Sequence, residues 1–188
     1  MSSDVAVGFV LFPELTALDF VGAYDPVTRL SSMGYLDLSW DLCVHEDATI
    51  RDDRGLAFAP TRACDTLEGY DVLVVPGGFG TRALEDDESF LAWLRTNDAD
   101  LLASVCTGSL LLGAAGYLEG KRATTHPTAY DDLEPYCAEV VEERVVEDGD
   151  VVTARGVSSG IDLGLHLCTR LADESVRDEI AAQMDYPY

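Results

Sequence analysis

A strand that runs into a cysteine and then into a helix constrains the fold of this chain more than any other feature. Within residues 100–120, Leu101–Val105 is a short, largely apolar run of the kind found in strands buried on both faces of a parallel sheet. Cys106 follows directly, and small and apolar residues continue through Tyr117, interrupted only by glycine. The pattern predicts a strand, a sharp turn and a helix, with the cysteine at the turn.

The position of Cys106 predicts a nucleophile. A strained turn between strand and helix lifts one side chain above the edge of the sheet, as in a nucleophile elbow. The helix start behind Cys106 offers free backbone N–H groups and the positive end of a dipole. Both favour thiolate over thiol, so we expect an acidic, reactive cysteine. The alternative is that Cys106 only fills core space, as many free cysteines do.

Length and apolar patterning bound the class of protein. The chain has 188 residues, which suits one domain over residues 1–188 with a sizeable core. No apolar run reaches the ~20 residues of a membrane span, and no basic segment precedes the N-terminal apolar run. We therefore expect a cytoplasmic protein with no signal peptide and no membrane partner.

The cysteines are widely spaced and form no CxxC pair, so we expect free thiols rather than a zinc ribbon or a redox pair. The five cysteines are Cys43, Cys64, Cys106, Cys137 and Cys168.

The charge balance is strongly acidic. The chain has 35 Asp and Glu against 12 Lys and Arg, a net charge of -23, and Lys121 is its only lysine. Phosphate contacts need a basic face, so we expect no nucleic-acid partner. An acidic, lysine-poor surface favours adaptation to high salt, where self-repulsion among carboxylates is screened. The alternative is an acidic protein of an ordinary cytoplasm.

Apolar runs and helical spacing alternate along the chain, which predicts a mainly parallel sheet covered by helices on both faces. Pro26 is expected to kink or bound the first helix, and an Asp-Gly pair at 148–149 predicts a hairpin turn. His166 and Cys168 are expected to pack inside the last long helix. The expected strands are 5–12, 36–44, 56–59, 71–76, 101–105, 121–125 and two runs within 139–154, and the expected helices are 15–30, 86–97, 107–117, 156–171 and a short one after 173.

Several polar or flexible residues follow expected strands. Gly77 and Gly78 come after the strand at 71–76, where a backbone N–H is able to serve an oxyanion hole; no GxGxxG pattern or Walker lysine supports a nucleotide site. His126 follows the run at 121–125, either as a general base or as a structural residue. Asp19, near the start of the first helix, is either a surface cap or a carboxyl with a perturbed pKa. Because ligands bind beyond the carboxyl ends of parallel strands, we expect the glycine loop, Cys106 and His126 to meet at one edge.

Four motifs together resemble the DJ-1/PfpI superfamily of class I glutamine amidotransferase-like proteins. They are VPGG at 75–78, ASVCTG at 103–108, GKRATTHP at 120–127 and GVSSGIDLGLHL at 156–167. The resemblance covers nearly the whole chain. It implies a flavodoxin-like three-layer α/β sandwich with a mainly parallel central sheet and a nucleophile elbow.

Within that superfamily, the chain resembles the isonitrile hydratase branch. LTALDFVG places Asp19 where that branch has aspartate, and Thr107 directly follows the cysteine. The protease-like branch has histidine after its cysteine, so the resemblance argues against peptidase activity. The regulator branch adds a C-terminal helix-turn-helix domain, which we do not expect here. The family commonly forms dimers, so we expect a homodimer.

The resemblance also implies a reaction on a small-molecule substrate without a metal or an organic cofactor. Cys106 is expected to attack the terminal carbon of an isonitrile, and Asp19, its pKa raised beside the thiolate, to supply the acid. A thioimidate would form, and water would release an N-substituted formamide. Thr107 is expected to position the reacting groups, with backbone N–H groups of Gly78 and Thr107 contacting developing charge. Gly77 and Gly108 are expected beside the substrate.

Two other functions stay open at this point. A site of cysteine, acid and His126 also resembles glyoxalase-like members of the superfamily, which act on small α-oxoaldehydes. A non-catalytic stress protein that senses oxidants through Cys106 is the other alternative, because an exposed thiol of low pKa oxidises readily.

Overall fold

The central feature of the molecule is a seven-stranded sheet with the strand order β10-β11-β7-β6-β1-β2-β5. The computed structural model describes residues 5–46, 49–63 and 65–187. Every pairing in this sheet is parallel except that of β10 with β11. Its strands are β1 (Val5–Val10), β2 (Leu38–Val44), β5 (Arg62–Ala63), β6 (Val72–Val75), β7 (Leu101–Val105), β10 (Val145–Asp148) and β11 (Val151–Ala154).

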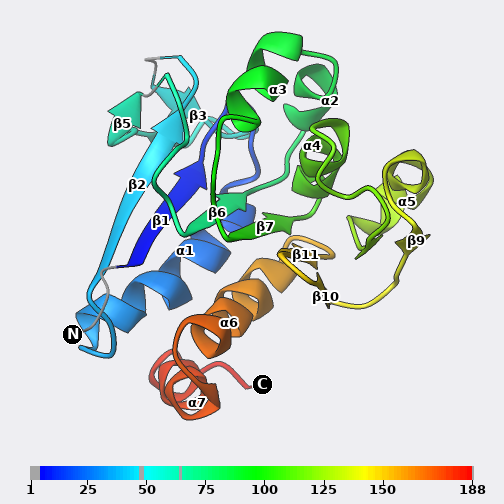
Figure 1. Cartoon of the computed structure of the whole chain (residues 1–188). Coiled ribbons are helices and arrows are strands. Elements are labelled where there is room, and N and C mark those ends of the chain that lie inside the picture. The colour runs from blue at the N-terminus through cyan, green and yellow to red at the C-terminus, as the bar shows by residue number, and fades with distance from the viewer. Residues whose placement is uncertain (1–4, 47–48, 64, 188) are drawn as a thin grey trace.

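Helices cover both faces of this sheet, as Figure 1 shows. Helices α1 (Ala17–Ser32) and α6 (Ser159–Leu171) pack together on one face, and α7 (Glu174–Gln183) packs on α6. On the other face lie α2 (Thr81–Leu84), α3 (Glu88–Leu94) and α4 (Gly108–Ala114). The predicted three-layer α/β fold with a mainly parallel sheet is confirmed.

Burial on both faces explains the apolar runs of the central strands. All residues of β6, β7 and β11 are buried, as expected where helices cover a parallel sheet on both sides. Pro26 lies inside α1 and does not end it. A Cβ at Gly164 of α6 would lie 2.8 Å from Pro26 Cγ, so the two helices meet there through small and ring side chains.

Two sequence predictions need correction at the flank of the sheet. Of residues 121–125, only β8 (Arg122–Ala123) forms a strand, and it pairs with β9 (Glu139–Val140) in a small separate sheet. The helix after Cys106 ends at Ala114, short of Tyr117. The predicted hairpin between β10 and β11 is confirmed, with Gly149 at a φ of +67° in its turn. A second small hairpin pairs β3 (Ile50–Arg51) with β4 (Ala57–Phe58), and α5 (Tyr130–Leu133) lies beyond β8.

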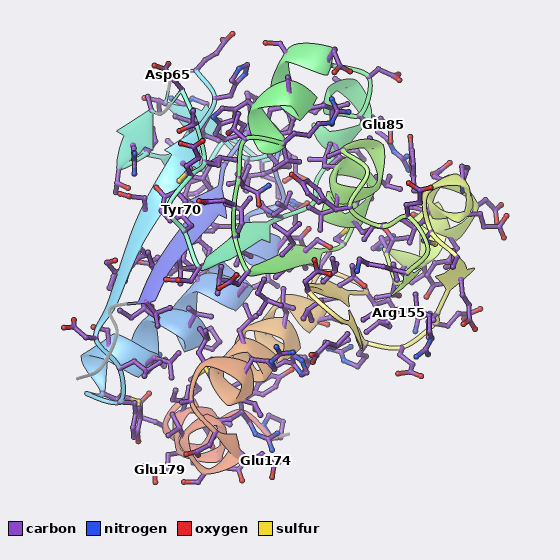
Figure 2. The ribbon with its side chains drawn as sticks, in the orientation of Figure 1. Asp65, Tyr70, Glu85, Arg155, Glu174 and Glu179 are labelled. Carbon is purple, nitrogen blue, oxygen red and sulfur yellow. The ribbon has the colours of Figure 1, made fainter. Side chains whose placement is uncertain are left out.

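Polar side chains tie several elements together. His166 is not simply packed, because its Nε2 lies 2.6 Å from Glu147 Oε2, whereas Cys168 is fully buried as predicted. Near the other edge of the sheet lies Tyr70, which is labelled in Figure 2, and its hydroxyl donates to Asp41 Oδ2 at 2.9 Å. Arg155, also labelled in Figure 2, lies over the ring of Tyr130 at 5.7 Å.

The described part of the chain contains no helix that is both long and apolar enough to cross a membrane. Within the same part, no group of three or more His, Cys, Asp or Glu side chains is arranged to hold a metal ion. Four cysteines are free thiols, and Cys64 lies outside the described residues; the four are Cys43, Cys106, Cys137 and Cys168.

Candidate active site

Cys106 sits at a strained turn between β7 and α4. Its φ is +56°, a left-handed conformation that side chains other than glycine rarely adopt. The turn is held from both sides: the Cys106 N–H donates to Ala154 O of β11 at 2.9 Å, and the Thr125 hydroxyl donates to Cys106 O at 3.0 Å. Strained backbone of this kind concentrates at functional sites. The predicted nucleophile elbow is present.

Gly77 allows a carboxyl to approach the cysteine. A Cβ on Gly77 would lie 2.6 Å from Thr107 N, 2.8 Å from Asp19 Oδ2 and 2.8 Å from Cys106 Cβ. Only a residue without a side chain fits among these three groups. The Gly77 N–H donates to Asp19 Oδ2 at 3.1 Å, which fixes the carboxyl in place. The loop after β6 therefore joins the start of α1 to the elbow.

Asp19 is fully buried, and this burial decides its protonation. Loss of solvation raises its pKa from 3.8 to about 7; its side-chain hydrogen bond with Cys106 and the Gly77 N–H oppose the rise. Asp19 Oδ1 is buried without a hydrogen-bond partner, which fits a carboxyl that keeps its proton to an unusually high pH. The raised pKa predicted for Asp19 is confirmed, with burial as the main cause.

The predicted acidity of Cys106 is wrong. Burial, and then the charge of Asp19, raise the pKa of the thiol to about 12. The backbone N–H and the hydroxyl of Thr107 both favour the thiolate, but they do not offset the loss of solvation. The two acids therefore titrate as a coupled pair in which Asp19 ionises before Cys106, so that one proton stays on the pair, on the thiol, once Asp19 has ionised.

Thr107 is bonded to the glycine loop rather than standing free. Its Oγ1 accepts the N–H of Gly78 at 3.1 Å and lies 3.0 Å from the hydroxyl of Thr81. The expected free donor at Gly78 is therefore already used inside the protein. Gly108 also differs from expectation, because a Cβ there would lie 2.3 Å from Val75 O. Gly108 serves the close packing of α4 on the end of β6.

His126 lies near the cysteine but is bonded elsewhere. Its Nδ1 accepts the N–H of Thr128 at 3.3 Å and lies 2.9 Å from Thr128 Oγ1, so the ring caps the short turn at Pro127–Ala129. No hydrogen bond joins His126 to Cys106 within the described ranges. His126 follows β8, which lies outside the main sheet. It therefore does not come from the carboxyl end of a main-sheet strand, as the sequence had predicted.

A cavity of about 530 Å³ opens over the elbow. Of the predicted residues, Cys106, Thr107, Gly78 and His126 line it, whereas Asp19, Gly77 and Gly108 lie behind its wall. Sequence reasoning missed the other lining residues, which are Thr16, Ala17, Leu18, Asp52, Asp53, Arg54, Phe79, Arg82, Thr128 and Val157.

The missed residues reach the cavity through tertiary contacts. The Asp53 N–H donates to Leu15 O at 3.1 Å, which brings the β3–β4 hairpin over the start of α1. Arg54 pairs with Asp53 at 2.7 Å, so this pair adds no net charge at the mouth. Phe79 is 72% exposed on the rim. The local signal that points to a turn here is the acidic pair at 52–53 before Gly55. It does not indicate which distant part of the fold this turn contacts.

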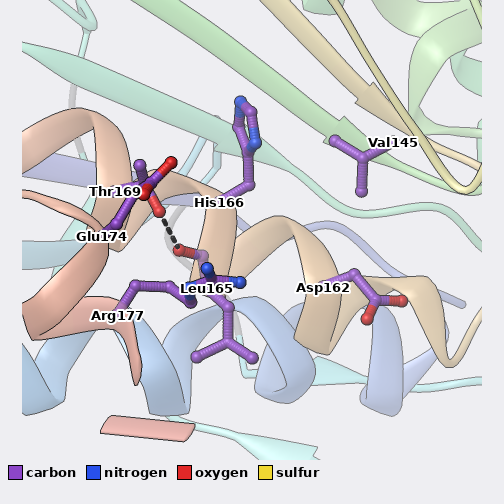
Figure 3. A pocket seen from close by; sticks show the side chains of 7 residues that line it. All are labelled: Val145, Asp162, Leu165, His166, Thr169, Glu174 and Arg177. Atoms are coloured by element: carbon purple, nitrogen blue, oxygen red, sulfur yellow. Dashed lines mark hydrogen bonds between the residues drawn. The ribbon is translucent and has the colours of Figure 1, made fainter. Parts of the chain in front are cut away.

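A second cavity, of about 350 Å³, lies over α6 and α7 and shares no lining residue with the first (Figure 3). Its polar walls come from Asp162, His166, Glu174 and Arg177, and the Thr169 hydroxyl there is bonded to its own helix at Leu165 O. Its lining includes no cysteine. The chemistry of the nucleophile elbow is therefore confined to the cavity at Cys106.

The site therefore places this chain among the α/β proteins that carry a cysteine at the sharp turn between a parallel strand and a helix. In this chain a buried carboxyl lies against that cysteine. Residues 6–170 match the DJ-1/PfpI family, and the chain belongs to that family.

Relatives in the family carry different activities. The chain is 39% identical over 183 residues to an isonitrile hydratase from Pseudomonas putida, and the matched region covers 96% of this chain and 78% of the relative. It is 29% identical to a deglycase from Pyrococcus horikoshii over 78% of this chain and 89% of that protein. A crystal structure of a ThiJ/PfpI family protein from Pseudomonas syringae superimposes with a TM-score of 0.87 at 31% identity, covering 100% of this chain and 77% of that one.

Proposed function

We propose that this protein is an isonitrile hydratase, which adds water to an isonitrile to give an N-substituted formamide. The observation that carries the proposal is the buried Asp19 carboxyl fixed against Cys106, since the pair holds one proton at neutral pH and above. Hydration of an isonitrile needs a nucleophile and an acid at the same carbon. The identity to the Pseudomonas putida isonitrile hydratase supports the same assignment.

In the first step, the Cys106 thiol passes its proton to the Asp19 carboxylate, so that the sulfur reacts as the thiolate and Asp19 carries the proton of the pair. The sulfur bonds to the terminal carbon of the isonitrile, and the Asp19 proton passes to that same carbon. The product is a thioimidate in which the carbon carries one hydrogen, a double bond to nitrogen and a bond to Cys106. Asp19 is left as a carboxylate, and the Thr107 N–H beside the sulfur stabilises the charge before attack.

In the second step, Asp19 acts as a base and then as an acid. Its carboxylate takes a proton from water, the water oxygen bonds to the thioimidate carbon, and the proton passes to nitrogen. Asp19 then takes the hydroxyl proton as the carbon–sulfur bond breaks. The formamide leaves, Asp19 returns the proton to the Cys106 sulfur, and the pair has returned to its starting state.

The test is formamide release from a simple isonitrile in molar KCl, with two single variants. Cys106→Ser keeps the size of the side chain and loses the thiolate, so we expect a folded protein without turnover. Cys137→Ser is the matched control, because this half-buried cysteine lies at Leu133 O, away from the cavity, and should leave turnover unchanged. Unchanged turnover in Cys106→Ser would contradict the mechanism.

The two alternatives receive less support from the geometry. A glyoxalase-like reaction is favoured by the deglycase relative, but it would use His126, which is bonded to Thr128 rather than to Cys106. An oxidant sensor needs a thiol of low pKa, whereas burial raises the pKa of Cys106. Methylglyoxal as a second substrate in the same assay tests the first alternative. A mass gain at Cys106 with peroxide, without turnover of either substrate, would favour the second.

We also propose that the protein acts as a cytoplasmic homodimer. Four large apolar side chains are exposed: Leu18 and Val21 on α1, Leu56 between β3 and β4, and Phe79 at the cavity. Apolar surface of this kind favours association. Sedimentation in molar KCl measures the state directly, and a monomer at micromolar concentration would contradict the dimer.

A further inference from the structure

Phe79 is a large apolar side chain that its own loop holds out on the rim of the cavity over the elbow. It is 72% exposed, although phenylalanine is among the residues most often buried. The glycines on either side of it press against the segment before α1. A Cβ at Gly78 would lie 2.4 Å from Glu14 O, and a Cβ at Gly80 would lie 2.1 Å from Pro13 O. These close contacts leave the loop little room to move, so the ring stays at the rim.

A second exposed apolar side chain lines the same cavity. The Thr16 N–H donates to Gly77 O at 2.9 Å, which ties the start of α1 to the loop that carries Phe79. Leu18 follows on α1, is 44% exposed and lines the cavity together with Phe79. Leu18 also directly precedes Asp19 in the sequence. The two segments that hold the reacting groups thus each place one large apolar side chain at the cavity.

The shape of an isonitrile decides which part of it meets these side chains. Its terminal carbon, its nitrogen and the first atom of its substituent lie on a line. When the carbon is at the Cys106 sulfur, the substituent therefore points away from the sulfur into the cavity of about 530 Å³. The substituent is then the part of the substrate that meets the other lining residues, Phe79 and Leu18 among them.

The charges around the cavity favour an uncharged substituent. Both arginines that line it are already paired with carboxylates, Arg54 with Asp53 at 2.7 Å and Arg82 with Asp132 at 2.7 Å. Arg82 also lies 3.7 Å from Glu85. A guanidinium that is paired in this way has little left to offer an anionic group, and the net charge of -23 repels one. Apolar contact is then the main attraction available to the substituent.

We propose that Phe79 is a specificity-determining residue: with Leu18 it forms an apolar wall that binds an uncharged hydrocarbon substituent of the isonitrile. The inference rests on the proposed function for the identity of the reacting group. The apolar wall belongs to the cavity whatever group reacts at Cys106. Because the substituent does not change during the reaction, the wall binds ground state and transition state alike, which lowers KM and leaves kcat unchanged.

The first experiment compares benzyl isonitrile with methyl isonitrile as substrates of Phe79→Ala. We expect the KM for benzyl isonitrile to rise about tenfold, the size of effect that one apolar contact has in a substrate pocket, with kcat unchanged. The KM for methyl isonitrile should stay as in the wild type, because its substituent is too small to reach the rim. Phe79→Tyr keeps the ring and should restore the wild-type KM for benzyl isonitrile.

Leu56→Ala is the matched control. Leu56 is a large apolar side chain with an exposed fraction of 55%, but it does not line the cavity. Its truncation removes a similar amount of exposed apolar surface and should leave the KM for both isonitriles unchanged. Sedimentation of Phe79→Ala and Leu56→Ala shows whether either side chain also serves association between copies of the chain.

A second readout needs no hydration. Cys106 is alkylated with N-benzyl iodoacetamide and with iodoacetamide, and mass spectrometry of the peptide that contains it gives the ratio of the two rates. A wall that binds the benzyl group raises this ratio in the wild type, so we expect the ratio to fall about tenfold in Phe79→Ala and to stay unchanged in Leu56→Ala. Each variant serves as its own reference, since a change in thiol reactivity alters both rates together.

An unchanged alkylation ratio in Phe79→Ala, an equal change of KM for both isonitriles, or a tyrosine variant as poor as the alanine variant would each overturn the proposal. A change in sedimentation without a change in the ratio would also overturn it, because the ring would then serve contact between copies of the chain. No formamide from the wild type, together with a ratio that falls in Phe79→Ala, would refute the hydratase and leave the apolar wall intact.

Discussion

Replacing Asp19 by asparagine tests the central feature of the site, a buried acid that keeps its proton. Asparagine is nearly the same size, and its side-chain oxygen still accepts the Gly77 N–H that now bonds Asp19 Oδ2 at 3.1 Å. The change removes the titration and leaves the packing. Formamide release should be lost, because the variant has no acid for the terminal carbon of the isonitrile.

The same variant should also become more stable relative to the wild type as pH rises. The folded state holds the Asp19 proton to about pH 7, whereas an unfolded chain releases it near the ordinary value of 3.8. Between these values the unfolded chain binds fewer protons, so the free energy of unfolding of the wild type falls with rising pH. This contribution is fully present below about pH 4 and is lost as pH passes about 7. A shift of about three units at 1.36 kcal/mol each amounts to about 4 kcal/mol.

Urea unfolding of both proteins from about pH 4 to about pH 8 measures this difference. The free energy of unfolding of Asp19→Asn, relative to the wild type, should rise by up to about 4 kcal/mol across the interval. Asp25→Asn is the matched control: it removes a carboxylate from the same helix, where a partly exposed pair with Arg29 at 2.9 Å contributes little. A flat difference for Asp19→Asn would refute the raised pKa.

The reactivity of the Cys106 thiol provides a second test of the Asp19→Asn substitution. The charge of Asp19 is the second cause of the raised thiol pKa, after burial. Without that charge the thiol should ionise at lower pH, so Cys106 in Asp19→Asn should be alkylated faster than in the wild type while turnover is lost. Slower alkylation, or full turnover, would remove the acid role of Asp19.

Two further predictions concern packing and charge. Gly77→Ala places a Cβ 2.6 Å from Thr107 N and 2.8 Å from Cys106 Cβ, so we expect lost turnover and a loss of about 1–3 kcal/mol in the free energy of unfolding. Denaturation and kinetics of this variant check it, and wild-type turnover would show that the loop relaxes without cost. The net charge of -23 predicts a midpoint of thermal unfolding that rises from low to molar KCl, as carboxylate repulsion is screened. A flat or falling midpoint would contradict the adaptation to salt.

The parts of the fold that sequence predicts well are those that local pattern controls. The apolar run at Leu101–Val105 forms β7 with the predicted bounds, because burial on both faces selects such residues. The cysteine after it adopts the elbow, since strand and helix on either side leave it only a sharp turn. The strand predicted over 121–125 was placed less well, because its pairing depends on a partner strand that local pattern does not reveal. That partner is β9 rather than a strand of the main sheet.

The chemistry of the site was less accessible to sequence. An acidic Cys106 follows from the helix start, which is a local feature, but the thiol pKa depends on solvent exclusion and on Asp19, 87 positions away in the sequence. Likewise the Gly78 N–H, which was expected to be free, donates to Thr107 Oγ1, a contact that only the folded loop creates. Local sequence indicates which groups are present, whereas burial decides which protons and donors they keep.

The site concentrates several costs in one place. Cys106 adopts a left-handed φ, Asp19 Oδ1 is buried without a partner, and the carboxyl destabilises the fold as pH rises. Each cost serves the proposed reaction. The strained turn aims the sulfur at the cavity, and dry burial prevents both acids from ionising together, so that one proton is always available for the isonitrile carbon. A more polar pocket would stabilise the fold and the thiolate together, but it would let both acids ionise and so remove the proton that the first step consumes.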